Sequence, residues 1–128
     1  MLDLLEVPHM ANNLTSELSG GQSKLVDIGR SMMGEPRLLL LDEPVAGVAG
    51  PLAMKIFSNL RKIVSETGIS VLIIEHNMDF IFRQGVDRIV VMNEGEILMV
   101  GTPDEVRSNR AVIEAYLGSD GRGGGVEN

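Results

Sequence analysis

The sequence predicts an α/β fold in which a mostly parallel sheet is flanked by helices and carries one β-hairpin at its edge. Three apolar runs of strand length, at residues 37–41, 69–75 and 87–92, alternate with segments of helical periodicity, and the connections between them are short. Continuous apolar runs indicate strands covered on both faces, as in parallel sheets. With 128 residues, the chain has the length of one domain with a real core.

The part before the first strand is expected to be mainly helical. Residues 1–7 are predicted to end a helix that Pro8 stops, and residues 12–16 are predicted to be a polar loop. A helix is predicted over residues 20–33, because apolar side chains recur there at helical spacing and Gly34 follows.

A second amphipathic helix is predicted between the first two strands. Glycines and Pro51 first break the chain, and Ile56, Leu60 and Ile63 then recur on one helical face. We expect this helix to end near Gly68.

The C-terminal part is predicted to combine short helices with the hairpin. A helix at residues 78–84 precedes the third strand, and a tight turn at residues 93–95 leads into the hairpin partner at residues 96–100. Thr102 and Glu105 have the spacing of a capping box, which predicts a helix there and another at residues 111–117.

Composition argues against several classes of function. The net charge of −7 and the pI near 4.7 oppose binding to phosphate backbones, and aromatic residues are only 3%, so we expect no nucleic-acid partner. The absence of cysteine fits a reducing cytoplasm. The apolar runs are far shorter than the roughly 20 residues of a membrane helix, and the N-terminus lacks a signal-peptide pattern, so we expect no membrane insertion.

The first segment with functional character is LSGGQ at residues 18–22, which opens a predicted helix. A helix start presents unpaired N–H groups to an anion, and Gly20 and Gly21 allow a ligand to approach the backbone. Ser19 can donate its hydroxyl. The alternative is a serine N-cap followed by flexible glycines.

Two further segments place polar residues at strand ends. Asp42 and Glu43 follow a buried run, where ligands of open α/β sheets bind, and can hold Mg²⁺ and activate a water. The alternative is a solvated acidic loop. His76 follows the next apolar run and can hydrogen-bond a phosphate, although a single histidine there is more often a polar loop residue.

Together, these segments resemble the nucleotide-binding subunit of ABC transporters. The stretch LSGGQSKLVDIGRSMMGEPRLLLLDEP is similar to that family's signature motif, the helix after it and the Walker B strand, and IIEHNM is similar to its switch-histidine loop. The resemblance continues through DRIVVMNEGEILMVGTPDEV to AYLG. Within the family, EPVAGV and RAVIEAYLG are similar to the ATPases of branched-chain amino-acid importers.

This resemblance implies the C-terminal portion of a P-loop NTPase-type fold. Residues 1–33 would be the end of the helical subdomain and the signature helix, residues 34–100 the core strands and helices, and residues 101–117 the C-terminal helices. Residues 118–128 hold five glycines and little to bury, and are expected to be a disordered tail.

The resemblance also implies ATP and Mg²⁺ as cofactors and a head-to-tail dimer. Ser19, Gly20 and Gly21 would contact the γ-phosphate of ATP held by the opposite subunit, with Gln22 supporting that loop. Hydrolysis would then drive membrane-spanning permease subunits, which implies a location in the cytoplasm at the inner face of the cell membrane.

In the chain's own site, the resemblance gives three residues a role. Asp42 would serve Mg²⁺, Glu43 would be the general base and His76 the γ-phosphate sensor. One departure is Ala49, where the family usually has Asp or Asn to touch the partner's site, so communication between the two sites is in question.

The phosphate-binding motif GxxxxGK followed by Ser or Thr does not occur in these 128 residues, because no lysine follows a glycine. We therefore expect a fragment, a truncated product or half of a split subunit. In the family the strand before that motif lies between the strands matched here by residues 71–75 and 88–92, so unpaired edges are predicted.

Several functions remain open on the sequence alone. The leading interpretation is an ATP-hydrolysing subunit of an importer, most similar to those for branched-chain amino acids. The first alternative is a non-enzymatic half-subunit that supplies its signature loop in trans, and the second is the ATPase of a urea or amide importer or a lipopolysaccharide exporter. A DNA-repair or chromosome-cohesion ATPase is disfavoured, because long coiled-coil insertions and a basic surface are absent.

Overall fold

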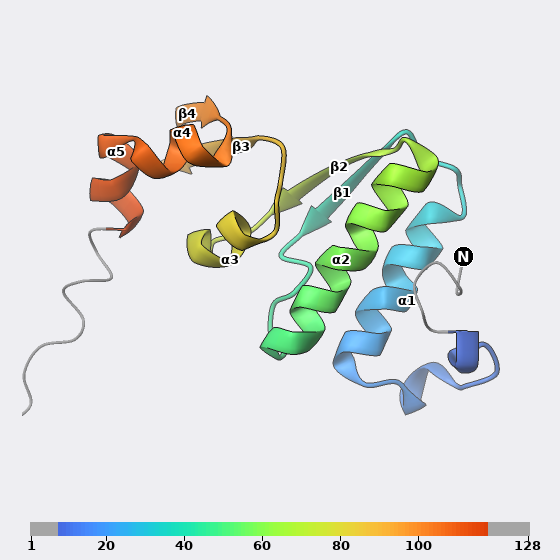
Figure 1. Cartoon of the computed structure of the whole chain (residues 1–128). Helices are drawn as coiled ribbons and strands as arrows, with labels where there is room; N and C mark the ends of the chain where they lie inside the picture. The colour runs from blue at the N-terminus through green and yellow to red at the C-terminus, as the bar shows by residue number, and fades with distance from the viewer. Residues whose placement is uncertain (1–7, 118–128) are drawn as a thin grey trace, which may run out of the picture. The chain divides into compact units, whose positions relative to one another are not determined.

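The computed structural model describes residues 8–117, which belong to two compact units divided between His76 and Asn77 (Figure 1). The predictions made for residues 1–7 and for the tail at residues 118–128 lie outside the described residues. Within residues 8–117, no helix combines the length and the apolar character that crossing a membrane requires.

The first unit consists of two helices and two strands. They are α1 (Gly20–Met32), β1 (Leu38–Asp42), α2 (Gly50–Thr67) and β2 (Ser70–Ile74), preceded by 3₁₀ turns at Pro8–Met10 and Thr15–Glu17. The order agrees with the prediction, although the expected loop at residues 12–16 contains part of a 3₁₀ turn. The chain break predicted at Pro51 is the first turn of α2, where proline is tolerated because the missing N–H has no helical partner.

β1 and β2 form a parallel pair with Leu38 opposite Ser70 and Asp42 opposite Ile74. The backbone N–H of Glu43 donates to the carbonyl of Ile74 at 2.9 Å, so the pairing continues one residue beyond β1. Both strands therefore deliver the residues that follow them to the same edge of the sheet.

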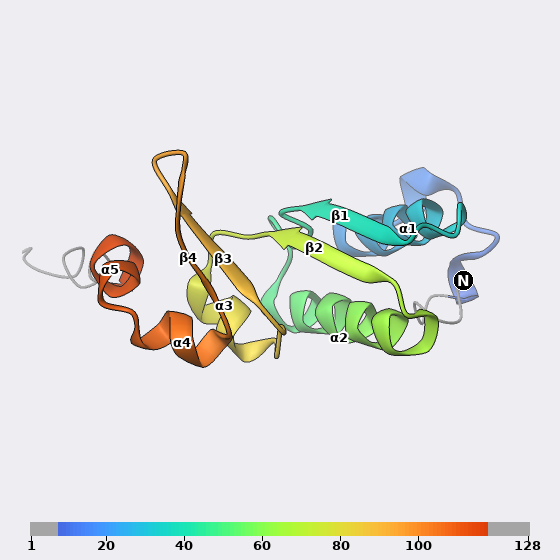
Figure 2. The same ribbon diagram turned by 90° about the horizontal axis from the view of Figure 1, so that it is seen from above.

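Both helices of this unit pack on one face of the strand pair. Figure 2 shows α1 along β1 and α2 along β2. The buried side chains come from α1, β1, α2 and Ile69 just before β2, and Val71 and Ile73 of β2 pack against them partly buried. The buried core residues are Leu25, Ile28, Met32, Leu39, Ile56, Leu60, Ile63 and Ile69.

The prediction that β1 is covered on both faces is wrong for the described residues. Leu39 is buried, but Leu38 and Leu40 are 52% and 65% exposed, and Leu72 and Ile74 on β2 are exposed beside them. The physical reason is that α1 and α2 supply one layer only, so alternate strand residues point away from it. The unit carries an exposed apolar face made of Leu38, Leu40, Leu72 and Ile74.

The second unit is a hairpin packed with short helices. Its elements are α3 (Met78–Arg83), β3 (Ile89–Asn93), β4 (Glu96–Gly101), α4 (Pro103–Ser108), α5 (Arg110–Val112) and a π-helical turn at Ile113–Leu117. β3 and β4 pair antiparallel, which confirms the predicted hairpin. Glu94 and Gly95 both have positive φ, of 49° and 81°, as two-residue turns of the favoured hand require.

The third strand, also expected to be covered on both faces, is covered on one. Ile89 and Val91 are buried with Val106 and Val112, whereas Val90 is 47% exposed. Within each unit the described strands form a pair, parallel in the first and antiparallel in the second. A strand that pairs on one side and packs on one face keeps its other apolar side chains in contact with solvent.

Side-chain caps fix the ends of the helices in the second unit. Thr102 and Glu105 form the predicted capping box at the start of α4. The side chain of Asn109 accepts from the N–H of Val112, which starts α5. The hydroxyl of Tyr116 donates to the carbonyl of Met92 and joins the π-helical turn to β3.

Candidate functional site

The signature segment opens α1 with two reciprocal hydrogen bonds. Oγ of Ser19 accepts from the backbone N–H of Gln22 at 3.2 Å, and Oε1 of Gln22 accepts from the backbone N–H of Ser19 at 2.9 Å. This capping box gives both side chains a structural role. A hydroxyl has one hydrogen and two lone pairs, so Ser19 can cap the helix and still donate its O–H to a ligand.

The two glycines of this segment differ in their surroundings. A Cβ placed on Gly20 would meet no heavy atom within 4 Å, so its backbone is open to an approaching group. A Cβ on Gly21 would overlap the side chain of Leu52 on α2. The sequence suggested ligand approach for both glycines, but at Gly21 helix packing by itself explains the missing side chain.

Asp42 and Glu43 occupy the carboxyl end of β1, as predicted. Glu43 adopts φ of +44°, which is uncommon for a residue other than glycine. Such backbone conformations are concentrated at functional sites, where the surrounding structure holds them in place. The N–H of Glu43 bonds to Ile74 and its carbonyl accepts from Ala46, so both neighbouring strands and the following turn fix this conformation.

Glu43 and His76 are brought together although they are 33 residues apart in the sequence. Oε1 of Glu43 lies 3.0 Å from Nδ1 of His76. The parallel register explains this contact, because Glu43 follows β1 and His76 follows β2 by two residues at the same sheet edge. The side chains are 46% and 77% exposed, so both are accessible to a ligand.

A third carboxylate, Glu75, stands beside this pair. Its Oε1 accepts from the backbone N–H of His76 at 3.0 Å and lies 3.4 Å from Nδ1 of the same residue. Its side chain is only 5% exposed. No role was predicted for Glu75 from the sequence, although the alternation of Val71, Ile73 and Glu75 places it on the inward side, directly after β2.

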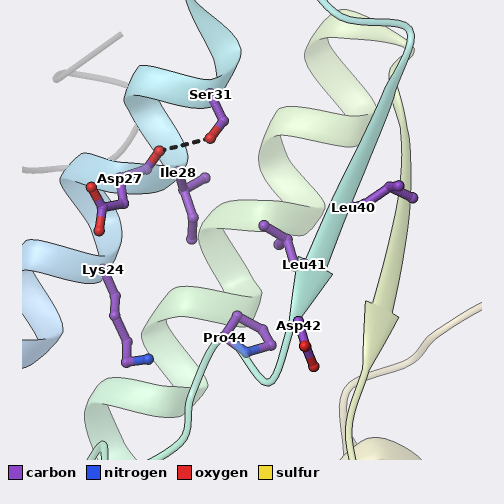
Figure 3. Close-up of a pocket in the computed structure, with 8 residues that line it drawn as sticks. All are labelled: Lys24, Asp27, Ile28, Ser31, Leu40, Leu41, Asp42 and Pro44. Atoms are coloured by element: carbon purple, nitrogen blue, oxygen red, sulfur yellow. Dashed lines mark hydrogen bonds between the residues drawn. The ribbon is translucent and has the colours of Figure 1, made fainter.

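Asp42 also lines a shallow depression of about 200 Å³ between α1 and the end of β1 (Figure 3). Its polar lining comes from Lys24, Asp27 and Ser31 of α1 together with Asp42, and Oγ of Ser31 donates to the carbonyl of Asp27. The apolar part of the lining consists of Ile28, Leu40, Leu41 and Pro44.

The described residues fit one Mg²⁺ ligand and no complete metal site. Asp42 is exposed at a strand end, but residues 8–117 contain no group of three or more acidic or histidine side chains placed to hold a metal ion. Mg²⁺ bound with a nucleotide takes only one or two protein carboxylates, because phosphates and waters complete its octahedron. Asp42 fits that single-ligand role.

The signature segment makes no hydrogen bond or ion pair to Asp42, Glu43 or His76 within residues 8–117. Ala49 is the N-cap of α2 and provides no side-chain cap. The candidate site thus consists of two separate parts: the start of α1, and the Glu43–His76 pair with Asp42.

Comparisons with known proteins match the chain at both ends. The family described as "ABC transporter" matches residues 1–46, and the family described as "Branched-chain amino acid ATP-binding cassette transporter" matches residues 96–122. A probable branched-chain amino acid transport ATP-binding protein, LivG of Methanocaldococcus jannaschii, is 40% identical over 92% of this chain. BraF of Pseudomonas aeruginosa, a high-affinity branched-chain amino acid transport ATP-binding protein, is 39% identical over 91% of it.

The names of other relatives specify different transported substrates. The spermidine/putrescine import ATP-binding protein PotA of Borreliella afzelii is 43% identical over 82% of this chain. The chain spans 47% of the length of LivG, 46% of BraF and 30% of PotA.

A solved structure has the same fold. It is the ADP conformation of an ATP-binding cassette of an ABC transporter, which aligns with a TM-score of 0.81 and 40% identity over 91% of this chain and 47% of its own. In sequence and in fold, this chain is therefore related to the ATP-binding subunits of ABC transporters and spans about half the length of those it matches, with branched-chain amino-acid transport proteins among its relatives.

Proposed function

We propose that the chain is part of the ATP-hydrolysing subunit of an ABC importer for branched-chain amino acids. The observation that carries the catalytic part is the 3.0 Å contact between Glu43 and His76, formed by residues that follow neighbouring parallel strands. The substrate is supported by LivG and BraF, whose names specify branched-chain amino acids.

In this proposal, the residues at the carboxyl ends of β1 and β2 bind the γ-phosphate and activate the attacking water. Glu43 accepts a proton from the water, and His76 orients the phosphate from the adjacent strand. Asp42 contributes one oxygen to Mg²⁺, which neutralises phosphate charge when it is bound with ATP. All three functional groups lie at one sheet edge, so a single bound nucleotide can contact them.

Ser19 and Gly20 are proposed to act on a different nucleotide, held by a partner subunit. Ser19 retains a hydroxyl hydrogen, Gly20 has open space above its backbone, and the first turn of α1 directs N–H groups outward. Gln22 holds Ser19 in place through the capping box. Gly21 belongs to this loop through its backbone, while its Cα faces Leu52.

The partners proposed are a second ATPase subunit and the membrane-spanning permease subunits that it drives. The proposed location follows from these partners: the cytoplasm, at the inner face of the cell membrane. The residue ranges of the domain interpretation, 1–33, 34–100 and 101–117 with a tail at 118–128, remain part of the same proposal.

A second candidate is a half-subunit that provides only its signature loop. It is favoured by the open backbone at Gly20, which a nucleotide on a partner can approach. In that case Glu43 and His76 would have no catalytic role in this chain, and the start of α1 would complete a site on an intact partner.

Complementation separates the two parts of the site. The chain is mixed with a full-length relative whose only lesion is Ser→Arg in its own signature loop, and ATP turnover is measured. We expect partial recovery, because the γ-phosphate needs donors from both subunits. Gly20→Asp should abolish the recovery through like-charge repulsion with phosphate, while Gly34→Asp, at another open glycine, should preserve it.

Glu43→Gln in the chain tests which site is being restored. Recovery should be nearly unchanged, because the base of the restored site belongs to the relative. If Glu43→Gln removes the recovery and Gly20→Asp does not, the assignment of the residues that act across the interface is reversed.

A further inference from the structure

Glu75 is a buried carboxylate for which the proposed function has no role. Its side chain is 5% exposed, compared with 46% for Glu43 beside it. The burial follows from strand alternation: Val71 and Ile73 pack against the core of the first unit, and Glu75 is the next residue of that parity. A carboxylate at such a position is costly unless hydrogen bonds compensate for lost water.

Two contacts of Glu75 are made to His76. Its Oε1 accepts from the backbone N–H of His76 at 3.0 Å, which fixes the main chain at the base of the imidazole. The same oxygen lies 3.4 Å from Nδ1 of His76, slightly beyond the usual range of N–H···O bonds. The distance from Oε1 of Glu43 to the same nitrogen is 3.0 Å, which lies within that range.

This geometry determines where the imidazole carries its hydrogen. Carboxylates only accept hydrogen bonds, so a nitrogen with two carboxylate oxygens around it must be the donor. Nδ1 of His76 therefore bears a hydrogen, and the ring presents Nε2 on its other side. The side chain of His76 is 77% exposed, so packing alone does not hold this orientation.

Glu43 is a weaker acceptor for the ring once it has taken up a proton, because a protonated carboxyl group accepts hydrogen bonds less strongly than a carboxylate. In the proposed function Glu43 takes a proton from water, and a carboxylate oxygen bonded to Nδ1 is less available for that task. Once Glu43 turns to the water, Glu75 is the remaining carboxylate at Nδ1. A shift of the ring by a few tenths of an ångström brings Nδ1 into ordinary hydrogen-bond range of Glu75.

We propose that Glu75 is a positioning residue that keeps Nδ1 of His76 as a hydrogen-bond donor when Glu43 releases it. The catalytic consequence rests on the proposed function, because it matters only if Glu43 and His76 act on a nucleotide. The local arrangement does not rest on it, and it can be measured on the chain without nucleotide.

The test uses the nitrogen resonances of the imidazole ring in the ¹⁵N-histidine-labelled chain. The sequence has two histidines, and the exposed His9 serves as an internal reference in every spectrum. Glu43→Gln removes the nearer carboxylate. We expect Nδ1 of His76 to keep the shift of a protonated nitrogen, because Glu75 takes over as the acceptor.

The double variant Glu43→Gln with Glu75→Gln should then lose this bias. An amide can donate as well as accept, so it no longer dictates the tautomer, and the Nδ1 shift of His76 should move toward that of His9. Glu43→Gln with Glu66→Gln is the matched control, because it removes the same charge from an exposed site on α2 and should leave the Nδ1 shift in place.

Two results would overturn the proposal. One is a His9-like Nδ1 shift in Glu43→Gln alone, and the other is an unchanged protonated shift in the Glu43/Glu75 double variant. Circular dichroism confirms the fold of each variant, and the single variant remains decisive if the double variant unfolds. None of these outcomes depends on ATP turnover, so failure here is distinct from failure of the complementation experiment.

Discussion

Gly21 on α1 lies directly against the side chain of Leu52 on α2, so closely that a Cβ at Gly21 would overlap it. Its neighbour Gly20 has no heavy atom within 4 Å of the same position. Two consecutive glycines of one motif are thus glycine for different physical reasons: close helix packing at Gly21 and open approach at Gly20.

We predict that Gly21→Ala destabilises the first unit by about 1–3 kcal/mol, the usual cost of overpacking, because the side chain of Leu52 must move. Gly20→Ala is the matched control and should be neutral or slightly stabilising, since alanine favours helix and meets free space. Urea denaturation followed by circular dichroism measures both.

Leu52→Ala gives the pair a second check. Combined with Gly21→Ala it should recover part of the loss, because the smaller side chain leaves room for the new methyl group. Strictly additive effects of the two substitutions would show that they do not share a contact, and would contradict the packing explanation.

Ala49 predicts a gain in stability. It is the N-cap of α2 and supplies no side-chain acceptor, so the N–H groups of the first turn lack a cap. Ala49→Asp should stabilise the chain by roughly 1 kcal/mol, through the cap and through charge opposite the helix dipole. Ala46→Asp, which adds the same charge in the preceding exposed turn, should give no comparable rise in the thermal midpoint.

The exposed apolar face of the first unit predicts self-association of the chain. Leu38, Leu40, Leu72 and Ile74 share one face of the β1–β2 pair, and exposed apolar strands favour association. Leu40→Lys should weaken association about tenfold or more, corresponding to at least 1.4 kcal/mol. Sedimentation velocity at micromolar concentrations gives the comparison.

Met33→Lys is the control for this prediction, because Met33 is 71% exposed at the end of α1 and outside the strand face. It should leave association unchanged. A monodisperse monomer in the unsubstituted chain would rule out this face as an association surface.

We predict little ATP hydrolysis by a protein made of these 128 residues alone. The residues after β1 and β2 can orient a phosphate, but no GxxxxGK loop is present to grip it. Turnover should be at least about 10²-fold below that of a full-length relative, since losing even one preorganised donor has that effect. Robust turnover that Glu43→Gln abolishes would refute this.

The sequence by itself determined the order of elements and most of their boundaries. Helical spacing of apolar residues, the capping pattern at Thr102 and Glu105, and the turn at Glu94 and Gly95 are local signals, because each depends on residues within a few positions. Resemblance to a family also identified Ser19, Asp42, Glu43 and His76 as candidates, and their roles remain proposals.

Only the tertiary structure decided which of these residues meet. The parallel register of β1 and β2 places Glu43 at 3.0 Å from His76, and strand parity buries Glu75 beside them. The tertiary structure also decided which apolar side chains are exposed. Leu40 has the same apolar character as Leu39, but α1 and α2 cover one face of the strands and leave Leu40 in solvent. Contacts between distant segments depend on how strands pair and which layers cover them, which local sequence does not encode.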